Sequence, residues 1–344
     1  MTATKFRVAY IDRPMYPSFV AVLQARPEIE LVRIDSARGD DPCAALLADC
    51  DGYYVQASRD ELPLRWHVSP ELIAAMPRLS VVASYGAGCD TIDVDACTAA
   101  GVAVVSQAGG NAQAVAEHAV GMMIALLKRM PESMLATRAG SVTRREAFIG
   151  RELSGKTIGI VGLGHTGSST ARLVRAFGCN VLAFDPYLDE ATCAERGATK
   201  VGLAALLTES DVVSLHCPLT AETRGLFDGP AIATMRRGSI FVNTARGSIC
   251  DEAALHQALS SGQLAGVGLD VWEREPPPAD HPLLRHPAVM ATPHMAGVTH
   301  ESRDRVARLA TEPFIEAAAG KLPTRLVNPE VAAAYSARRA ALVG

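Results

Sequence analysis

Three apolar segments of the second half of the chain end in side chains that could act together on a small acid. Arg246 follows SIFVNTA, Glu275 follows GVGLDV after a short gap, and His294 ends VMATPH. A guanidinium grips a carboxylate and a neighbouring carbonyl with a planar fork of donors. An imidazole exchanges protons near neutral pH, and a carboxylate beside it raises its pKa and fixes its tautomer. Together these groups suit hydride and proton exchange at the carbon next to a carboxylate.

Each of the three residues also has an ordinary explanation when it is taken alone. Arg246 could be a surface charge, His294 could cap the following segment, and Glu275 could be a loop residue before three prolines. In an open α/β sheet, however, ligands bind beyond the carboxyl ends of the strands. Because all three follow successive strand-like segments, we interpret them as one catalytic cluster.

The segment GLGHTG (162–167) predicts a phosphate-binding turn. A strand-like run ends at Gly162, a helix-like run begins directly afterwards, and the next strand-like run ends at Asp185. Glycines let a backbone approach a pyrophosphate, whose charge lies at the helix N-terminus, and the acid accepts hydrogen bonds from the ribose hydroxyls. A glycine turn that only packs helix on strand would not explain Asp185. We therefore expect a dinucleotide site.

Asp185 also predicts which dinucleotide binds. A carboxylate at this position repels a 2′-phosphate, and 186–188 supply no cation to neutralise it. Arg196 is the first basic residue afterwards, and we expect it to be out of reach. The expected cofactor is NAD. Asp270, at a strand end, is then placed to hold the nicotinamide carboxamide.

The elements that must position these residues form two α/β series. Strand-like runs alternate with helix-like runs and short connections, which predicts parallel sheets with crossover helices. The expected strands are 6–11, 29–34, 52–57, 79–85 and 102–106, and then 156–162, 180–185, 211–217, 239–245, 266–271 and 289–294.

A long amphipathic stretch at 111–130 predicts a helix that connects the two series. A helix over 301–319 runs back, and 324–344 read as a tail. We therefore expect two doubly wound parallel-sheet domains, a Rossmann NAD domain inserted in a flavodoxin-like substrate domain. The substrate domain would comprise 1–107 plus 297–344, and the NAD domain 108–296.

The composition excludes several other classes of protein. The 344 residues are 49% hydrophobic and 20% charged, which is ordinary for a globular protein of two domains. A net charge of −4 provides no basic surface for nucleic acid. No apolar run is long enough to span a membrane, and Asp12 and Arg13 interrupt the first apolar run, so we expect no signal peptide. Eight cysteines without a CxxC pair indicate thiols in a reducing cytoplasm and no metal site.

The first series offers a second binding element in SYGAGCDTID (84–93). Tyr85 precedes Gly86, Ala87 and Gly88, whose successive backbone N–H groups could form an anion-binding nest for the substrate carboxylate. An ordinary glycine turn is the alternative. Arg59 could meet a second anionic group of the substrate, or it could be a solvated loop charge.

The chain resembles the D-isomer-specific 2-hydroxyacid dehydrogenases, which include D-lactate, glycerate, hydroxypyruvate/glyoxylate and D-3-phosphoglycerate enzymes. The resemblance covers most of 80–300. The matching stretches are YGAGCDTID, NAQAVAEHAVGMMIALLKR, GKTIGIVGLGHTG with Asp185, HCPLT, NTARGSICDEAAL, GVGLDVWEREPP and TPHMAG. The one departure inside the glycine turn is His165-Thr166, where the family more often has Arg-Ile.

The resemblance implies the roles of arginine, glutamate and histidine for Arg246, Glu275 and His294. It also implies a homodimer that assembles through the NAD domain, and a small 2-keto or 2-hydroxy acid as substrate. The full set of expected cofactor-binding residues is Gly162, Gly164, His165, Thr166, Gly167, Asp185, Cys217, Pro218, Thr223, Thr244, Ala245 and Asp270.

Two other functions remain open on the sequence. The chain could be an NAD-sensing regulatory protein of the same fold, because such proteins can retain the catalytic trio. It could also be a formate- or phosphite-type dehydrogenase, although Glu275 stands where formate enzymes have a glutamine.

Overall fold

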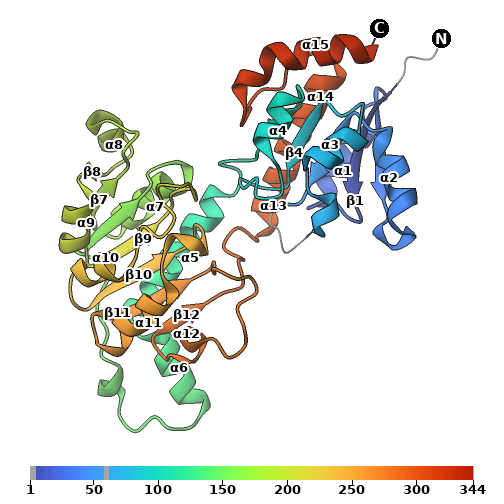
Figure 1. The fold of residues 1–344 in the computed structure, drawn as a ribbon. Coiled ribbons are helices and arrows are strands. Elements are labelled where there is room, and N and C mark those ends of the chain that lie inside the picture. Colours follow the sequence, from blue (N-terminus) through green and yellow to red (C-terminus); the bar gives the residue numbers. More distant parts are fainter. Residues whose placement is uncertain (1–4, 58–61, 344) are drawn as a thin grey trace. The chain divides into compact units, whose positions relative to one another are not determined.

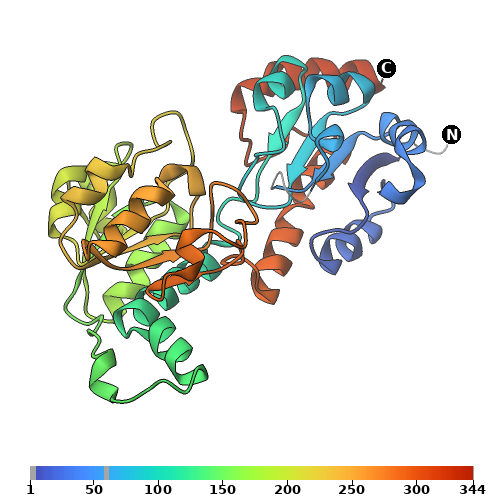
Figure 2. The same cartoon turned by 60° about the horizontal axis from the view of Figure 1, so that its bottom comes forward.

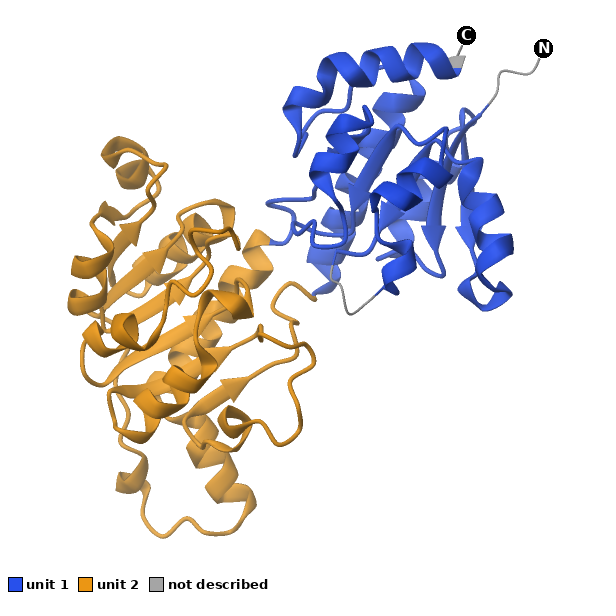
Figure 3. Ribbon diagram, viewed as in Figure 1, with its two compact units in different colours: residues 1–111, 299–344 blue, residues 112–298 orange. Residues whose placement is uncertain are grey.

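A computed structural model of the chain describes residues 5–57 and 62–343. The chain divides into two compact units, residues 1–111 with 299–344 and residues 112–298 (Figure 3). We refer to them as unit 1 and unit 2. The domain boundaries expected from the sequence, 1–107 plus 297–344 for the substrate domain and 108–296 for the NAD domain, stay predictions.

Unit 1 is built on a parallel five-stranded sheet in the order β2-β1-β3-β4-β5, which is the flavodoxin-like order. Alternate residues of the strands enter two apolar clusters: Val8 and Tyr10 pack on one face of the sheet, and Ala9 and Ile11 on the other. Helices therefore cover both faces (Figure 1). The strands are β1 (Phe6–Ile11), β2 (Ile29–Ile34), β3 (Gly52–Val55), β4 (Val81–Ser84) and β5 (Ala103–Val105), and the helices are α1 (Pro17–Gln24), α2 (Asp40–Ala48), α3 (Pro70–Ala75), α4 (Val94–Ala99), α13 (His300–Leu309), α14 (Glu312–Ala318) and α15 (Ala332–Val343).

Unit 2 contains a parallel seven-stranded sheet in the order β12-β11-β10-β9-β6-β7-β8. This order reverses direction beside β6, which is the Rossmann arrangement. Helices again lie on both faces of the sheet (Figure 2). The strands are β6 (Thr157–Val161), β7 (Asn180–Phe184), β8 (Thr199–Lys200), β9 (Val212–Leu215), β10 (Ser239–Asn243), β11 (Leu264–Leu269) and β12 (Val289–Ala291), and the helices are α5 (Ala112–Leu127), α6 (Met130–Arg138), α7 (His165–Ala176), α8 (Glu190–Glu195), α9 (Leu203–Glu209), α10 (Gly229–Thr234), α11 (Glu252–Ser260) and α12 (Pro282–Arg285).

The expected fold of two doubly wound parallel-sheet domains is confirmed, but three local expectations are wrong. Residues expected as a tail form α15, where Tyr335 is 2% exposed and the Arg338 guanidinium donates to the carbonyl of Leu79. The expected single helix over 301–319 is two helices, and the second begins at Glu312-Pro313, where proline favours a first turn. The sequence analysis expected six strands in the second series and missed β8, because a two-residue strand is too short to leave an apolar run.

None of the helices in the described part of the chain is long and apolar enough to cross a membrane. Seven of the eight cysteines are buried. Among residues 5–57 and 62–343, no group of three His, Cys, Asp or Glu side chains could hold a metal ion.

Candidate active site

The glycine turn connects β6 to α7, and two of its three glycines are required by the protein itself. Gly162 has φ 85°, and a Cβ there would lie 2.7 Å from the backbone of Cys217. A Cβ on Gly167 would lie 2.0 Å from the Gly162 carbonyl oxygen. The first glycine therefore permits the turn, and the third lets α7 pack directly on it.

Gly164 is different, because a Cβ there would have no protein atom within 4 Å. It precedes His165 and Thr166, the first residues of α7, and His165 is exposed. A glycine with open space around it, at the positive end of a twelve-residue helix, fits a site where a phosphate approaches the backbone. The turn therefore fits the pyrophosphate of a dinucleotide.

Asp185 directly follows β7 and is tied to the glycine turn. Its Oδ2 accepts the Leu163 N–H at 2.9 Å and its Oδ1 accepts the Tyr187 N–H at 3.1 Å. The side chain is half-buried, and each oxygen keeps a lone pair for another donor. This arrangement leaves the carboxylate able to accept ribose hydroxyls.

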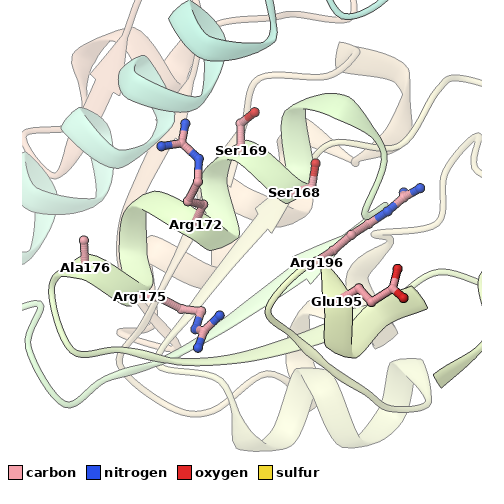
Figure 4. A pocket seen from close by; sticks show the side chains of 7 residues that line it. All are labelled: Ser168, Ser169, Arg172, Arg175, Ala176, Glu195 and Arg196. Carbon is pink, nitrogen blue, oxygen red and sulfur yellow. The ribbon is translucent and has the colours of Figure 1, made fainter. Parts of the chain in front are cut away.

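The expectation that Arg196 is out of reach of this turn is wrong. The guanidinium donates to the Leu163 carbonyl at 2.6 Å from a position directly after α8, which ends at Glu195. Figure 4 shows it in a pocket of about 680 Å³ on the outer side of α7, whose lining residues are Ser168, Ser169, Arg172, Arg175, Ala176, Glu195 and Arg196. Leu163 thus donates its N–H to Asp185 and accepts a cation on its carbonyl oxygen.

The remaining residues expected at the cofactor site follow β9 and β10. Thr223 Oγ1 donates to the Pro218 carbonyl at 2.7 Å and so closes the loop that begins at Cys217. Burial raises the pKa of the Cys217 thiol to about 11. After β10, the Thr244 hydroxyl is buried and has no hydrogen-bond partner among the described residues, while Ala245 is buried. A buried hydroxyl of this kind is a plausible ligand contact, since buried polar groups are normally paired.

Arg246 is held by the last residue of β10. The Asn243 amide donates to the Arg246 carbonyl at 2.9 Å and accepts the Ala245 N–H at 2.9 Å. Asn243 itself is fully buried. This one side chain therefore folds the turn that carries the arginine.

Asp270, at the end of β11, organises the loop that carries His294. Its carboxylate accepts the Thr292 hydroxyl at 2.6 Å and the backbone N–H groups of Met295 and Ala296 at 2.8 and 2.9 Å, and its carbonyl accepts the His294 N–H at 2.7 Å. His294 has φ 53°, a left-handed conformation that histidine tolerates better than most side chains. The nicotinamide role expected for Asp270 stays a prediction, with one lone pair of Oδ2 available for it.

His294 and Glu275 form a directly bonded pair. The distance from His294 Nδ1 to Glu275 Oε2 is 2.7 Å, and Glu275 Oε1 accepts the Trp272 N–H at 3.0 Å. Glu275 is therefore fixed at both oxygens. Within the described residues no hydrogen bond engages the other ring nitrogen of His294, and 36% of the side chain is exposed.

The charges around this pair shift both pKa values. The hydrogen bond that His294 donates to Glu275 raises the pKa of His294, against burial and the charge of Arg246, and Asp270 adds to the rise. The pKa of Glu275 is lowered overall, although burial raises it. The lowering comes from the hydrogen bond and charge of His294, from the Trp272 N–H and from the charge of Arg246. Because Arg246 acts electrostatically on both, the structure brings the three expected residues together.

Gly247 sets how closely the arginine loop approaches the glutamate loop. A Cβ at this position would lie 1.9 Å from the Trp272 carbonyl carbon and 2.3 Å from the Glu273 nitrogen. No side chain fits there without movement of the backbone. The sequence analysis missed this glycine, because only the distant Trp272 explains it.

His118 was also missed. It projects from α5, with Nε2 at 3.2 Å from Thr292 Oγ1 and 3.8 Å from Asp270 Oδ1. It therefore extends the hydrogen-bonded group behind His294. The sequence analysis missed His118 because a histidine in a long amphipathic helix is usually an ordinary polar residue of its surface.

The expected substrate loop lies in unit 1, directly after β4. The Gly86 N–H donates to Ser84 Oγ at 3.3 Å, so one donor of the expected nest is occupied. Ala87 is exposed, and the N–H groups of Ala87 and Gly88 make no backbone hydrogen bond within the described residues. Arg59 lies outside the described residues.

Tyr85 also lines a pocket of unit 1 that the sequence did not predict. Its volume is about 420 Å³, and Asp12, Arg13, Pro14, Met15, Gln56, Tyr85 and Arg303 surround it. The carboxylate of Asp12 is engaged by the amide and hydroxyl of Ser36. Gln56 Oε1 is buried without a hydrogen-bond partner in the described part of the chain. Two arginines, Arg13 and Arg303, are therefore among the residues that line the pocket.

Comparison with known proteins agrees with this geometry. Residues 120–296, just over half of the chain, match the sequence model of the D-isomer specific 2-hydroxyacid dehydrogenase, NAD binding domain. A glyoxylate reductase of Korarchaeum cryptofilum is 39% identical over 267 residues, which cover 77% of this chain and 80% of that protein. The chain belongs to this family.

Other members extend the likeness to unit 1. The crystal structure of a glyoxylate reductase from Paecilomyes thermophila matches this chain with a TM-score of 0.83 and 30% identity. The match covers 96% of this chain and 99% of that chain. A D-3-phosphoglycerate dehydrogenase of Archaeoglobus fulgidus is 40% identical over 258 residues, which cover 75% of this chain and 49% of that protein. The chain thus spans about half the length of the first curated relatives it matches.

Proposed function

We propose that this protein is an NAD-dependent dehydrogenase that interconverts a small D-2-hydroxyacid and its 2-keto acid. The observation that carries the proposal is the bonded pair of His294 and Glu275, within electrostatic reach of Arg246, in the NAD-binding unit. When bound, the nicotinamide supplies or accepts the hydride at C2 of the acid.

Each residue then has one task in keto acid reduction. Arg246 binds the carboxylate and polarises the keto carbonyl through charge-assisted hydrogen bonds. The protonated His294 donates its proton to the carbonyl oxygen as the hydride arrives, and Glu275 stabilises the imidazolium and orients the ring. The backbone N–H groups of Ala87 and Gly88 in unit 1 stay proposed donors to a carboxylate. In the reverse direction the neutral His294 takes the proton of the hydroxyl group.

The test is the oxidation of NADH by a panel of 2-keto acids. The panel contains glyoxylate, hydroxypyruvate, pyruvate and phosphohydroxypyruvate, each also measured with NADPH. We expect turnover of at least one keto acid and faster turnover with NADH, because Asp185 repels a 2′-phosphate and the Arg196 guanidinium is already bonded to the Leu163 carbonyl. The absence of turnover with every keto acid would contradict the proposal and favour a regulatory role for NAD binding.

We propose further that the pocket of unit 1 favours substrates with a second anionic group. Arg13 and Arg303 both line it, and Arg303 makes no ion pair within the described residues. We expect Arg303→Met to lower kcat/KM for phosphohydroxypyruvate by about tenfold, which corresponds to the loss of one charge-assisted hydrogen bond. The kcat/KM for pyruvate should stay unchanged. The exposed Arg26 of the same unit, replaced by Met, is the control. Equal losses with both substrates would assign Arg303 to folding instead.

The protein is proposed to work as a homodimer that forms through unit 2. The segment 130–149 exposes large apolar side chains in an arm of that unit, namely Met130, Met134, Leu135, Val142 and Ile149. An apolar patch of this kind is typical of an interface. Sedimentation velocity should show a dimer, and Leu135→Glu should dissociate it. The control is Leu64→Glu in unit 1, where the Leu64 side chain is 80% exposed, and this variant should leave the dimer intact. A wild-type monomer would refute this arrangement.

A further inference from the structure

The loop that carries Glu275 joins β11 to α12, and it is attached to the rest of unit 2 at few points. Between Glu273 and Asp280 the chain contains three consecutive prolines, which have no N–H to donate. Within the described part of the chain, Glu275 itself bonds to Trp272, inside the loop, and to His294. What fixes the two ends of this loop therefore decides where Glu275 lies.

Both ends of the loop are bonded to one side chain, that of Glu252 in the first turn of α11. Its Oε1 accepts the Glu273 N–H at 2.7 Å, and its Oε2 lies 3.0 Å from His281 Nε2. The Glu252 and His281 side chains are only 11% and 18% exposed, so water weakens these bonds little. Within the described residues no other side chain bonds to both ends of the loop.

Neighbouring contacts make this attachment directional. The His281 ring packs edge-on against Trp272, with ring centroids 5.5 Å apart. His281 Nδ1 is buried without a partner, so a neutral ring keeps its proton on Nε2 and donates it to Glu252. Trp272 Nε1 donates to the Thr292 carbonyl at 3.1 Å, two residues before His294. Glu252 is therefore connected to both members of the catalytic pair through the loop.

We infer that Glu252 is a positioning residue that holds the 273–281 loop so that Glu275 stays bonded to His294. Glu252 touches neither substrate nor cofactor in this scheme, and it acts only through Glu275. The inference rests on the proposed function for its kinetic consequences, but the bond between Glu275 and His294 can be measured without any substrate.

Removal of the Glu252 carboxylate should release both loop ends and let Glu275 withdraw. The groups that face His294 are Glu275 and Asp270, which raise its pKa, and Arg246, which lowers it. With Glu275 farther away, burial and Arg246 prevail and the pKa of His294 falls. A displacement of about 1 Å at a reacting group can reduce a rate about a hundredfold, so we expect Glu252→Ala to lower kcat by about ten- to a hundredfold with NADH affinity unchanged.

The decisive measurement is the NMR titration of His294 in the protein without substrate, assigned by comparison with His294→Asn. Glu252→Ala and His281→Asn should each lower the pKa of His294 relative to wild type, and Glu252→Gln, which keeps one acceptor for Glu273, should lower it less. Asp280→Ala removes an exposed side chain of the same loop and should leave the titration unchanged. This readout works whether or not the protein reduces keto acids, so it separates the two proposals.

A Glu275→Gln background distinguishes positioning from general destabilisation. If Glu252 acts through Glu275, Glu252→Ala should cause no further fall in the pKa of His294 or in kcat once Glu275 is replaced. An unchanged titration in Glu252→Ala, or a second fall of equal size in the double variant, would overturn the inference. If the alanine variant does not fold, Glu252→Gln and His281→Asn decide the question by the same criterion.

Discussion

The glycine turn and the catalytic loops of unit 2 are built in different ways. The turn is one continuous stretch, and its geometry depends on glycine backbones and on Asp185, directly after β7. The catalytic residues come from three separate loops, and buried side chains such as Asn243 and Asp270 hold each loop through its backbone. A site of the first kind is a local motif, whereas a site of the second kind depends on residues that never meet the substrate.

The largest effect should come from His294. Replacement by Ala or Asn should lower kcat by about 10²–10⁴-fold, because the proton donor is lost. Asn also tolerates the left-handed φ of 53°, so it separates lost chemistry from backbone strain. Steady-state kinetics and NADH titration check this together, and NADH affinity should stay near wild type because the glycine turn is a separate structure. A wild-type rate in either variant would show that the catalytic loops are misassigned.

Gly247→Ala should disturb the catalytic loops without removing a reactive group. The added Cβ would lie 1.9 Å from the Trp272 carbonyl carbon, so the loops of Arg246 and Glu275 must separate. We expect kcat to fall by about a hundredfold and the free energy of unfolding to fall by about 1–3 kcal/mol. Gly229→Ala, whose nearest neighbour would be 3.9 Å away, is the matched control for kinetics and urea unfolding. Similar results for both variants would mean that the close approach does not matter.

Two glycines of the turn should separate binding from folding. Gly164→Ala meets no protein atom within 4 Å, so its stability should be near wild type while the Kd for NADH rises about tenfold or more, about 1.4 kcal/mol. Gly167→Ala would place a Cβ 2.0 Å from the Gly162 carbonyl and should lower the melting temperature as well. Fluorescence titration and thermal unfolding measure the two effects. An unchanged Kd in Gly164→Ala would place the pyrophosphate elsewhere.

The difference between the two regions also explains what the sequence could predict. The sequence predicts the two parallel sheets because apolar runs mark each strand locally. It predicts the glycine turn and the grouping of Arg246, Glu275 and His294 because these residues stand at the ends of those runs. Arg196 was misjudged because its reach depends on where the end of α8 lies relative to the glycine turn, which its sequence distance does not reveal.

The residues that support the catalytic loops could not be predicted for a related reason. Glu252, His118 and Gly247 look like ordinary helix or loop residues until their partners on other elements are known. The helix α15 was expected as a tail, since most of its residues are alanine, serine or arginine and its buried aromatic contact comes from Tyr335. In each case the information lies in the partner and not in the segment.

The smallest expected effect, a shift along the pH axis, tests the catalytic loops most selectively. Glu275 raises the pKa of His294, and reduction of a keto acid needs the protonated ring. The rate of reduction should therefore be constant at low pH and fall as the pH rises through this raised pKa, while hydroxyacid oxidation should rise over the same range. Glu275→Gln removes the cause of the rise, so both limbs should move to lower pH, and Asp185→Asn in the cofactor region should move neither. If the two variants shift the limbs equally, the pH dependence belongs to cofactor binding and not to the bond between Glu275 and His294.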